Sequence, residues 1–236
     1  MAPMALEAVI FDWGGTLTPW HTVDVAHAWR AVASKLDPDR VDQLAGRLLA
    51  AEDALWKRTR HEHSGASLAE VFELAELTLA EDALVPLFDF WEPHTYTDPD
   101  VLPLFKELRA RGLKVGVLSN TMWPRAEHDR ILARDGVLDL LDATVYSSEL
   151  PWAKPHPRAY EAALEAVGVS AADSAVYVGD RIFEDVYGAQ AAGLRAVHVP
   201  HSDIPVHQLT DVTAEPDAVV DRLLDLLPVV DRWLTE

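Results

Sequence analysis

The sequence predicts an α/β protein with a doubly wound parallel sheet, a Rossmann-like core, and a small helical domain inserted into it. Five short runs rich in valine and other β-forming residues lack apolar/polar alternation, which is typical of parallel strands covered on both faces. Helical patterns separate these runs, and the strand–helix–strand repetition favours a sheet with helices on both sides. The predicted strands are residues 6–11, 113–119, 143–147, 175–179 and 195–199.

Helices of the core are expected between and after these strands. Three of the helical patterns stop at a glycine, which is a common signal just past a helix C-terminus. A polar loop is expected over residues 201–217, before a last helix. The predicted core helices are residues 100–112, 157–168, 184–193 and 218–227.

Residues 19–97 break this rhythm because they show helical periodicity without a convincing strand. Amphipathic patterns predict helices at 24–36, 40–58 and 67–79, and a turn-rich stretch then returns to the core. We therefore expect a core made of residues 1–18 and 98–236, with residues 19–97 as a helical cap.

Composition limits the classes of function. The net charge of −19 disfavours nucleic acid, whose phosphates need a basic surface. The absence of cysteine excludes disulfides, thiolate chemistry and cysteine-ligated metals. The N-terminal stretch does not resemble a signal peptide, and no window approaches the length of a membrane span, so no membrane association and a cytoplasmic location are expected.

Reactive side chains follow four of the predicted strands. Because the carboxyl ends of parallel strands meet at one edge of a sheet, these side chains are expected in one crevice. Carboxylates crowded around a phosphate-sized space repel one another unless a cation joins them, and hard oxygen ligands favour Mg²⁺. A lone lysine there would balance a carboxylate and a phosphate. The residues concerned are Asp12, Ser119, Asn120, Thr121, Lys154, Asp180, Glu184 and Asp185.

Four motifs carry these residues: FDWGGTLT (11–18), VLSN (117–120), KPHP (154–157) and VGDRIFEDVYGAQAAGL (178–194). In this order and spacing they resemble the four motifs of the haloacid dehalogenase-like (HAD) hydrolase superfamily. The helical insert between the first and second motifs resembles the small cap of the type I members. The resemblance implies a hydrolase, phosphatase-like, that acts on phosphoric monoesters.

The resemblance also implies a role for each matching residue. Asp12 would be the nucleophile and form an aspartyl-phosphate. Ser119 would hydrogen-bond the phosphoryl oxygens, and Lys154 would offset their charge. The residues implied to bind Mg²⁺ are Asp12, the Gly14 carbonyl, Asp180 and Asp185, with Glu184 more ambiguous; those implied to bind substrate, with N–H groups that cradle the phosphate, are Gly15, Thr16 and Asn120.

The first motif departs from the superfamily's pattern at Gly14. Phosphatases of the superfamily usually have an aspartate there, which protonates the leaving alcohol and later activates water. The carbonyl contact to the metal survives in glycine, but the proton transfer does not, at a cost of roughly 10²–10⁴-fold for a poor leaving group. A phosphatase would then need a substrate that leaves easily, such as an acyl or anomeric phosphate, or a replacement group; the candidates are Thr18, His21, Lys57, His61 and His63.

Three alternatives to a phosphatase of a small phosphorylated metabolite stay open. Phosphonoacetaldehyde hydrolases have a similar first motif and use a cap lysine as a Schiff base, for which Lys57 is the candidate here. Haloacid dehalogenases also lack the second aspartate, but they dispense with metal and with the acidic pair that Asp180 and Asp185 retain. A non-catalytic member would bind a phosphorylated ligand or a protein partner. The sequence defines neither the substrate nor the oligomeric state.

Overall fold

The structure is a computed structural model that describes residues 6–80, 82–200 and 210–236. Its centre is a six-stranded sheet in the order β3-β2-β1-β4-β5-β6, in which every pair is parallel. The first five strands confirm the predicted strands to within two residues at either end. The strands are β1 Ala8–Phe11, β2 Lys114–Ser119, β3 Ala143–Tyr146, β4 Ala175–Gly179, β5 Arg195–His198 and β6 Ala218–Val219.

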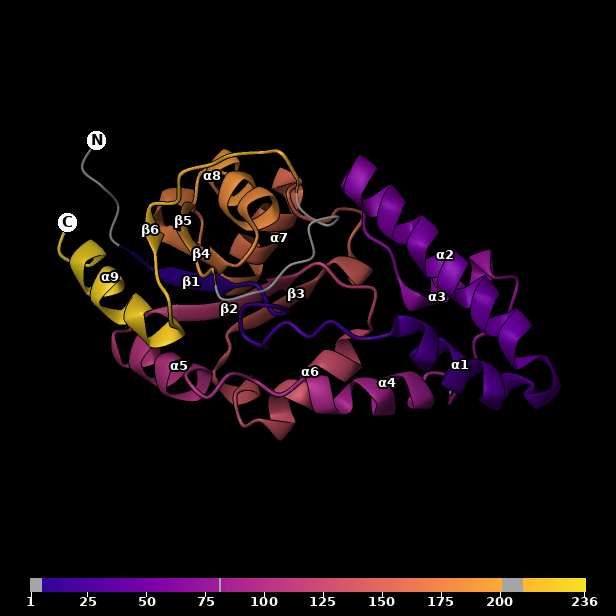
Figure 1. Ribbon diagram of the computed structural model, residues 1–236. Coiled ribbons are helices and arrows are strands. Elements are labelled where there is room, and N and C mark those ends of the chain that lie inside the picture. Colours follow the sequence, from indigo (N-terminus) through magenta and orange to yellow (C-terminus); the bar gives the residue numbers. More distant parts are fainter. Residues whose placement is uncertain (1–5, 81, 201–209) are drawn as a thin grey trace.

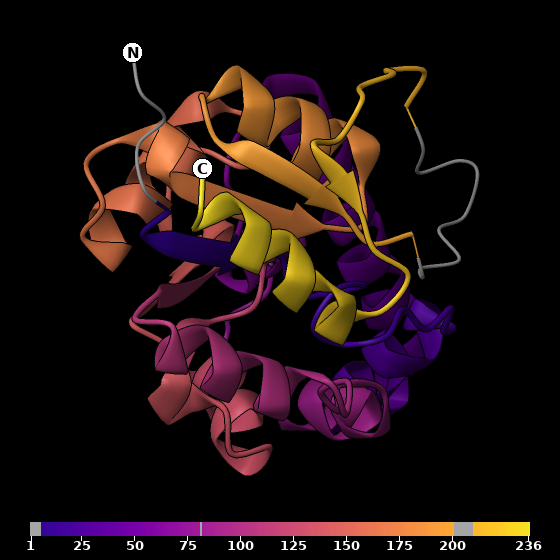
Figure 2. The same cartoon turned by 90° about the vertical axis from the view of Figure 1, so that its left-hand side faces the viewer.

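Helices cover both faces of this sheet (Figure 1). In the turned view of Figure 2, the strands lie between the orange helices above and the magenta helices below. Alternate residues of a strand pack against the two layers of core helices. In β1, Val9 and Phe11 share a hydrophobic cluster with α5 and α9. Ala8 and Ile10 share the other cluster with α7. The core helices are α5 Val101–Ala110, α6 Arg125–Arg134, α7 Pro157–Val167, α8 Gly188–Ala191 and α9 Leu226–Trp233.

The C-terminal part of the core differs from the prediction. The helix expected at 218–227 is wrong at its start, because residues 218–219 extend the sheet beside β5 and α9 begins only at Leu226. The helix expected at 184–193 is a π-helical turn over residues 182–187 followed by the short α8. Helix α6 was not predicted. Of the expected polar loop, residues 201–209 lie outside the described residues.

In the described residues, four α-helices lie between β1 and α5 in the chain, and we call them the helical layer. They share a hydrophobic cluster that includes Trp29, Leu48 and Phe72. Apart from residue 81, which is not described, residues 19–97 contribute no strand to the sheet. These helices are α1 Val25–Leu36, α2 Val41–Glu62, α3 Leu68–Leu74 and α4 Val85–Trp91. In Figure 1, α1, α2 and α3 lie at the right, and α4 lies along the bottom beside α6. Helix α4 was not predicted, and the domain boundaries at residues 19 and 97 stay a prediction.

Residues 63–66, which we call the docking segment, join the helical layer to the core through backbone hydrogen bonds. The Gly65 N–H donates to the Pro151 carbonyl at 3.1 Å, and the His63 carbonyl accepts from the Ala153 N–H at 2.8 Å. A Cβ atom at Gly65 would lie 2.0 Å from the Leu150 carbonyl oxygen, so only glycine fits this close approach. The docking segment therefore holds the helical layer against the loop that leads into Lys154.

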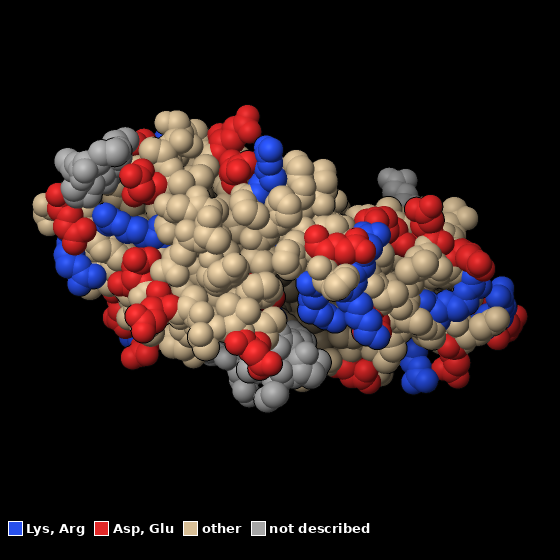
Figure 3. Space-filling view, turned by 90° about the horizontal axis from the view of Figure 1, so that it is seen from above, with Lys and Arg blue, Asp and Glu red and all other residues tan. Residues whose placement is uncertain are grey.

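The charged side chains are predominantly acidic, with 39 Asp and Glu against 20 Lys and Arg. Figure 3 shows Asp and Glu side chains toward both ends of the molecule, with Lys and Arg side chains among them. Some of these charges pair across elements: Glu92 lies 2.5 Å from Arg130 and 3.0 Å from Arg134 of α6. Within the described part of the chain, no helix is both long and apolar enough to cross a membrane.

Candidate active site

The loop after β1 places Asp12 at the carboxyl edge of the sheet. The Asp12 N–H donates to the Val178 carbonyl of β4 at 2.9 Å, which continues the pairing of the two strands by one residue. The chain then turns back on itself: the Gly15 N–H donates to the Thr18 carbonyl at 2.7 Å, and the Thr18 N–H donates to the Trp13 carbonyl at 2.9 Å. Gly15 has a φ of 90°, which favours glycine over any other residue. The turn therefore holds the Asp12 backbone at the end of the central strand.

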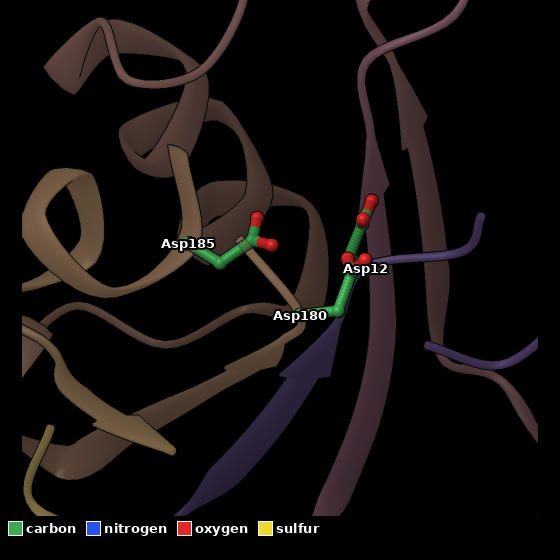
Figure 4. A group of neighbouring side chains, drawn as sticks. All are labelled: Asp12, Asp180 and Asp185. Atoms are coloured by element: carbon green, nitrogen blue, oxygen red, sulfur yellow. The ribbon is translucent and has the colours of Figure 1, made fainter. Parts of the chain in front are cut away.

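Three buried carboxylates meet at this edge. Asp12 follows β1, Asp180 follows β4, and Asp185 lies in the π-helical turn after it; one oxygen of each lies within 4.8 Å of the others. Figure 4 shows the Asp185 carboxylate pointing toward Asp12 and Asp180. The Arg181 N–H fixes Asp185 by donating to its Oδ2 at 2.8 Å. The sheet order reverses between β1 and β4, so the cluster occupies the switch point where ligands of doubly wound sheets bind.

Lys154 is the cation of this cluster. The residue is 3% exposed, and its ammonium lies 2.9 Å from Asp12 Oδ1 and 2.6 Å from Asp185 Oδ1. A third oxygen, the Tyr177 hydroxyl of β4, accepts from Lys154 Nζ at 2.6 Å. The Asn120 side chain holds the Lys154 backbone by donating to its carbonyl and accepting from its N–H, both at 2.8 Å.

Burial and neighbouring charges determine the protonation of the cluster. Burial raises the pKa of Asp12, and the Asp185 carboxylate raises it further, against the opposing effect of Lys154. Burial opposes the positive charge of Lys154, but Asp12 and Asp185 outweigh it and raise the pKa of the ammonium. Burial also raises the pKa of the Tyr177 phenol well above its ordinary value, so this hydroxyl stays protonated.

The donor set fits a divalent metal ion. Among the described residues, the three buried carboxylates of Asp12, Asp180 and Asp185 lie together beside the Lys154 ammonium. Buried charges of this kind are stable when paired or joined by a metal. All the side-chain donors are hard carboxylate oxygens, the ligands that Mg²⁺ prefers. The residues that would hold the ion are Asp12, Asp180 and Asp185.

The remaining predicted residues lie in or beside this cluster. Thr16 is buried, and its hydroxyl donates to Asp180 Oδ1 at 3.4 Å. Ser119 is the buried last residue of β2. Gly14 has open space beside it: apart from its two chain neighbours, no atom lies within 4 Å of the position that a Cβ would take. The observed partner of Asn120 is the Lys154 backbone, and its contact with substrate stays a prediction.

Comparison with known proteins agrees with this geometry. Residues 6–193 match the family model of the haloacid dehalogenase-like hydrolases. The chain belongs to this family. It is 34% identical over 202 residues to Phosphatase MT3486 of Mycobacterium tuberculosis, covering 84% of this chain and 89% of that protein. It is 28% identical over 236 residues to the glyceraldehyde 3-phosphate phosphatase of Methanopyrus kandleri, covering 95% of this chain and 97% of that protein.

Solved structures of the HAD family share the fold. A HAD phosphatase from Thermococcus onnurineus superposes with a TM-score of 0.65 at 23% identity, over 95% of this chain and 98% of that one. Family membership confirms the resemblance that the four motifs predicted, and it makes the chain a hydrolase.

Sequence reasoning missed three contacts of this HAD site. Tyr177 reaches Lys154 from within β4, and the His198 ring lies 3.1 Å from the Asp180 carbonyl through Nε2. The Arg181 guanidinium lies 5.2 Å from the centre of the Trp20 ring, which links the fourth motif to the start of the helical insert. The sequence signal for the contact between Tyr177 and Lys154 is weak: Tyr177 is a tyrosine in an otherwise aliphatic strand, three residues before Asp180.

Lys57 and His63 are two of the candidate groups that could replace the aspartate absent at position 14, and they lie in different surroundings. Lys57 is mostly exposed on α2 and pairs with Asp53 one turn earlier, at 2.6 Å. His63, in the docking segment, packs against Phe183 of the π-helical turn with ring centres 5.9 Å apart. Burial lowers the pKa of His63, with a further contribution from His156. Of these two, only His63 is seen to contact an element of the site.

Proposed function

We propose that this protein is an Mg²⁺-dependent phosphatase that hydrolyses a small phosphorylated metabolite through an aspartyl-phosphate on Asp12. The observation that carries the proposal is the convergence of Asp12, Asp180, Asp185 and Lys154 at the switch point of the sheet. The phosphatase names of its relatives from Mycobacterium tuberculosis and Methanopyrus kandleri support it. The net charge of −19 supports a small substrate rather than a nucleic acid. The cytoplasmic location stays a prediction.

In the first step, an Asp12 oxygen forms a bond to phosphorus while the bond to the leaving oxygen breaks. Lys154 offsets the negative charge of the transferring group, and Ser119 with the N–H groups of Gly15 and Thr16 orients its oxygens. Bound Mg²⁺ supplies a further positive charge that lets the anionic nucleophile and the phosphate approach each other. Because Gly14 has no proton to give, the leaving oxygen takes its proton from water or keeps its charge.

In the second step, water attacks the phosphorus of the aspartyl-phosphate. The bond to the Asp12 oxygen breaks, inorganic phosphate leaves, and the carboxylate is regenerated. The docking segment supports the exclusion of bulk water during both steps, because it holds the helical layer against the loop that carries Lys154. Hydrolysis is therefore proposed to depend on Asp12 as nucleophile and on Lys154 as counter-charge.

The test compares the wild-type protein with Asp12→Asn on p-nitrophenyl phosphate and acetyl phosphate, with and without Mg²⁺. We expect Mg²⁺-dependent turnover that falls by about 10³-fold or more in Asp12→Asn, because an amide is a poor nucleophile. Mg²⁺ binding measured by calorimetry should weaken in the same variant. Asp53→Asn, which makes the same change on the surface of α2, is the matched control and should behave as wild type.

Other outcomes would identify a different reaction. Metal-independent release of chloride from 2-chloropropionate would show a dehalogenase and overturn the proposal. Borohydride trapping of an imine on Lys57 in the presence of phosphonoacetaldehyde would show carbon–phosphorus cleavage instead. Phosphate binding without turnover of any of these compounds would show a non-catalytic member of the family.

A further inference from the structure

Among the described residues, the Lys154 ammonium has three oxygen partners, one for each of its hydrogens. Its three N–H groups face Asp12 Oδ1 at 2.9 Å, Asp185 Oδ1 at 2.6 Å and the Tyr177 hydroxyl at 2.6 Å. The two carboxylates are the charged partners, and the phenol is the neutral third one. Three contacts therefore define the direction of the ammonium. One of them comes from Tyr177, which lies just before the fourth motif and is not among its catalytic residues.

The Tyr177 hydroxyl can only accept from Lys154. A phenol has one hydrogen to donate, and Tyr177 donates it at 2.7 Å to the Leu118 carbonyl of β2, the strand on the other side of β1. The lone pair of its oxygen is then directed at Lys154 Nζ. The ring itself is fully buried on β4 and cannot turn away, since it packs edge-on against the Tyr160 ring with centres 5.4 Å apart.

The backbone end of Lys154 is held as well. Asn120 makes two hydrogen bonds to it, one to the carbonyl and one from the N–H. A lysine side chain has a flexible four-carbon stem with several rotatable bonds, so its ammonium would otherwise sample several directions. Contacts at both ends restrict the side-chain conformations that bring the ammonium to Asp12 and Asp185.

We propose that Tyr177 is a positioning residue that aims the Lys154 ammonium at the nucleophile Asp12. The proposal rests on the phosphatase function proposed above. Without the hydroxyl, one buried N–H of Lys154 and the Leu118 carbonyl lose their partner, and the ammonium is free to rotate toward Asp185 and away from Asp12. Charge compensation at the transferring phosphoryl group then weakens, although substrate and metal still meet the same carboxylates.

The test is Tyr177→Phe, which keeps the ring and removes only the hydroxyl. We expect kcat for acetyl phosphate and p-nitrophenyl phosphate to fall by about tenfold or more, because the lost hydrogen bond involves a charged group. KM should change by less than about threefold, because substrate and metal still meet the same carboxylates. Tyr146→Phe is the matched control: Tyr146 is also buried, and its hydroxyl lies 3.4 Å from Asp129 rather than near Lys154. Circular dichroism gives the folded fraction of each variant.

A second comparison separates positioning from general packing. In a Lys154→Met background, adding Tyr177→Phe should change kcat by less than about twofold, because the partner through which Tyr177 acts is gone. The full tenfold loss in that background would overturn the proposal, as would a wild-type kcat in Tyr177→Phe alone.

A readout without turnover distinguishes this proposal from the function on which it rests. In ¹⁵N-lysine-labelled protein, the buried Lys154 ammonium should give a slowly exchanging proton signal that disappears in Lys154→Met and exchanges faster in Tyr177→Phe. If the wild type hydrolyses no phosphate ester, the proposed function fails while this signal still tests the contact. If the wild type is active and the Lys154 signal is the same in Tyr177→Phe, the positioning role fails alone.

Discussion

Replacement of Gly14 by aspartate should raise the rate of phosphate ester hydrolysis selectively for poor leaving groups. The structure leaves room for a Cβ, because beyond the two chain neighbours no atom lies within 4 Å of the point where it would sit, and the backbone there is not left-handed. A positioned general acid is worth roughly 10²–10⁴-fold, or about 3–5 kcal/mol of activation free energy. A fourth carboxylate near the cluster opposes this gain by about 3 kcal/mol at a separation of roughly 5–6 Å and an effective dielectric constant of about 20.

Saturating Mg²⁺ offsets most of that repulsion, so we expect a net gain of about 10²-fold for a simple alkyl phosphate. For p-nitrophenyl phosphate, whose leaving group needs no proton, the gain should stay below about threefold. The assay measures kcat for both substrates at saturating Mg²⁺. Gly14→Asn, which has the same shape but no acid, is the control. Equal gains on both substrates, or the same gain with asparagine, would refute the reasoning that Gly14 removes a proton donor.

Two further predictions concern stability. Gly65→Ala should lower the free energy of unfolding by about 1–3 kcal/mol, since its Cβ would meet the Leu150 carbonyl at 2.0 Å, whereas Gly46→Ala, with open space inside α2, should raise it by up to about 1 kcal/mol. Urea titration measures both, and a stable Gly65→Ala protein would contradict the observed docking. Burial lowers the pKa of His128 to about 3, with a smaller effect of Arg125. Between about pH 6.5 and 3, the unfolded chain therefore binds a proton at this residue and the folded protein does not. Stability should therefore fall by about 1.4 kcal/mol per pH unit from pH 6.5 toward 3 through this residue, and His128→Phe should remove that part of the slope.

The parts of the fold that follow from local pattern were predictable. Buried parallel strands have a continuous apolar composition, so β1 to β5 could be recognised from the residues alone. The two-residue β6 could not, because it is a strand only by virtue of its pairing with β5. Helix α6 has a polar composition, and two of the four residues it buries, Glu127 and His128, are not typical core residues; Ile131 and Leu132 alone make a weak amphipathic pattern.

The candidate site divides in the same way. The sequence alone predicts that four side chains lie together, because each follows a strand and parallel strands end at one edge; they are Asp12, Lys154, Asp180 and Asp185. Tyr177 could not be placed, since a tyrosine within a strand is normally a packing residue and its hydroxyl partner is remote in sequence. The docking segment was also missed, because pairing between two loops depends on their positions in space and leaves no periodic pattern.

The position of β1 in the sheet has a consequence for how the molecule folds. Its first residue, Ala8, pairs with Lys114 on one side and with Ala175 on the other. Forming these two pairs brings together residues that are far apart in the sequence, so each pair closes a very long loop of chain. Such closures cost chain entropy and slow folding, whereas α1 to α4 make their contacts nearby in sequence. We therefore expect the helical layer to form early and shorten the first closure. A chain still lacking β4 would expose one edge of β1, and that species, rather than the native protein, is where self-association during folding would begin.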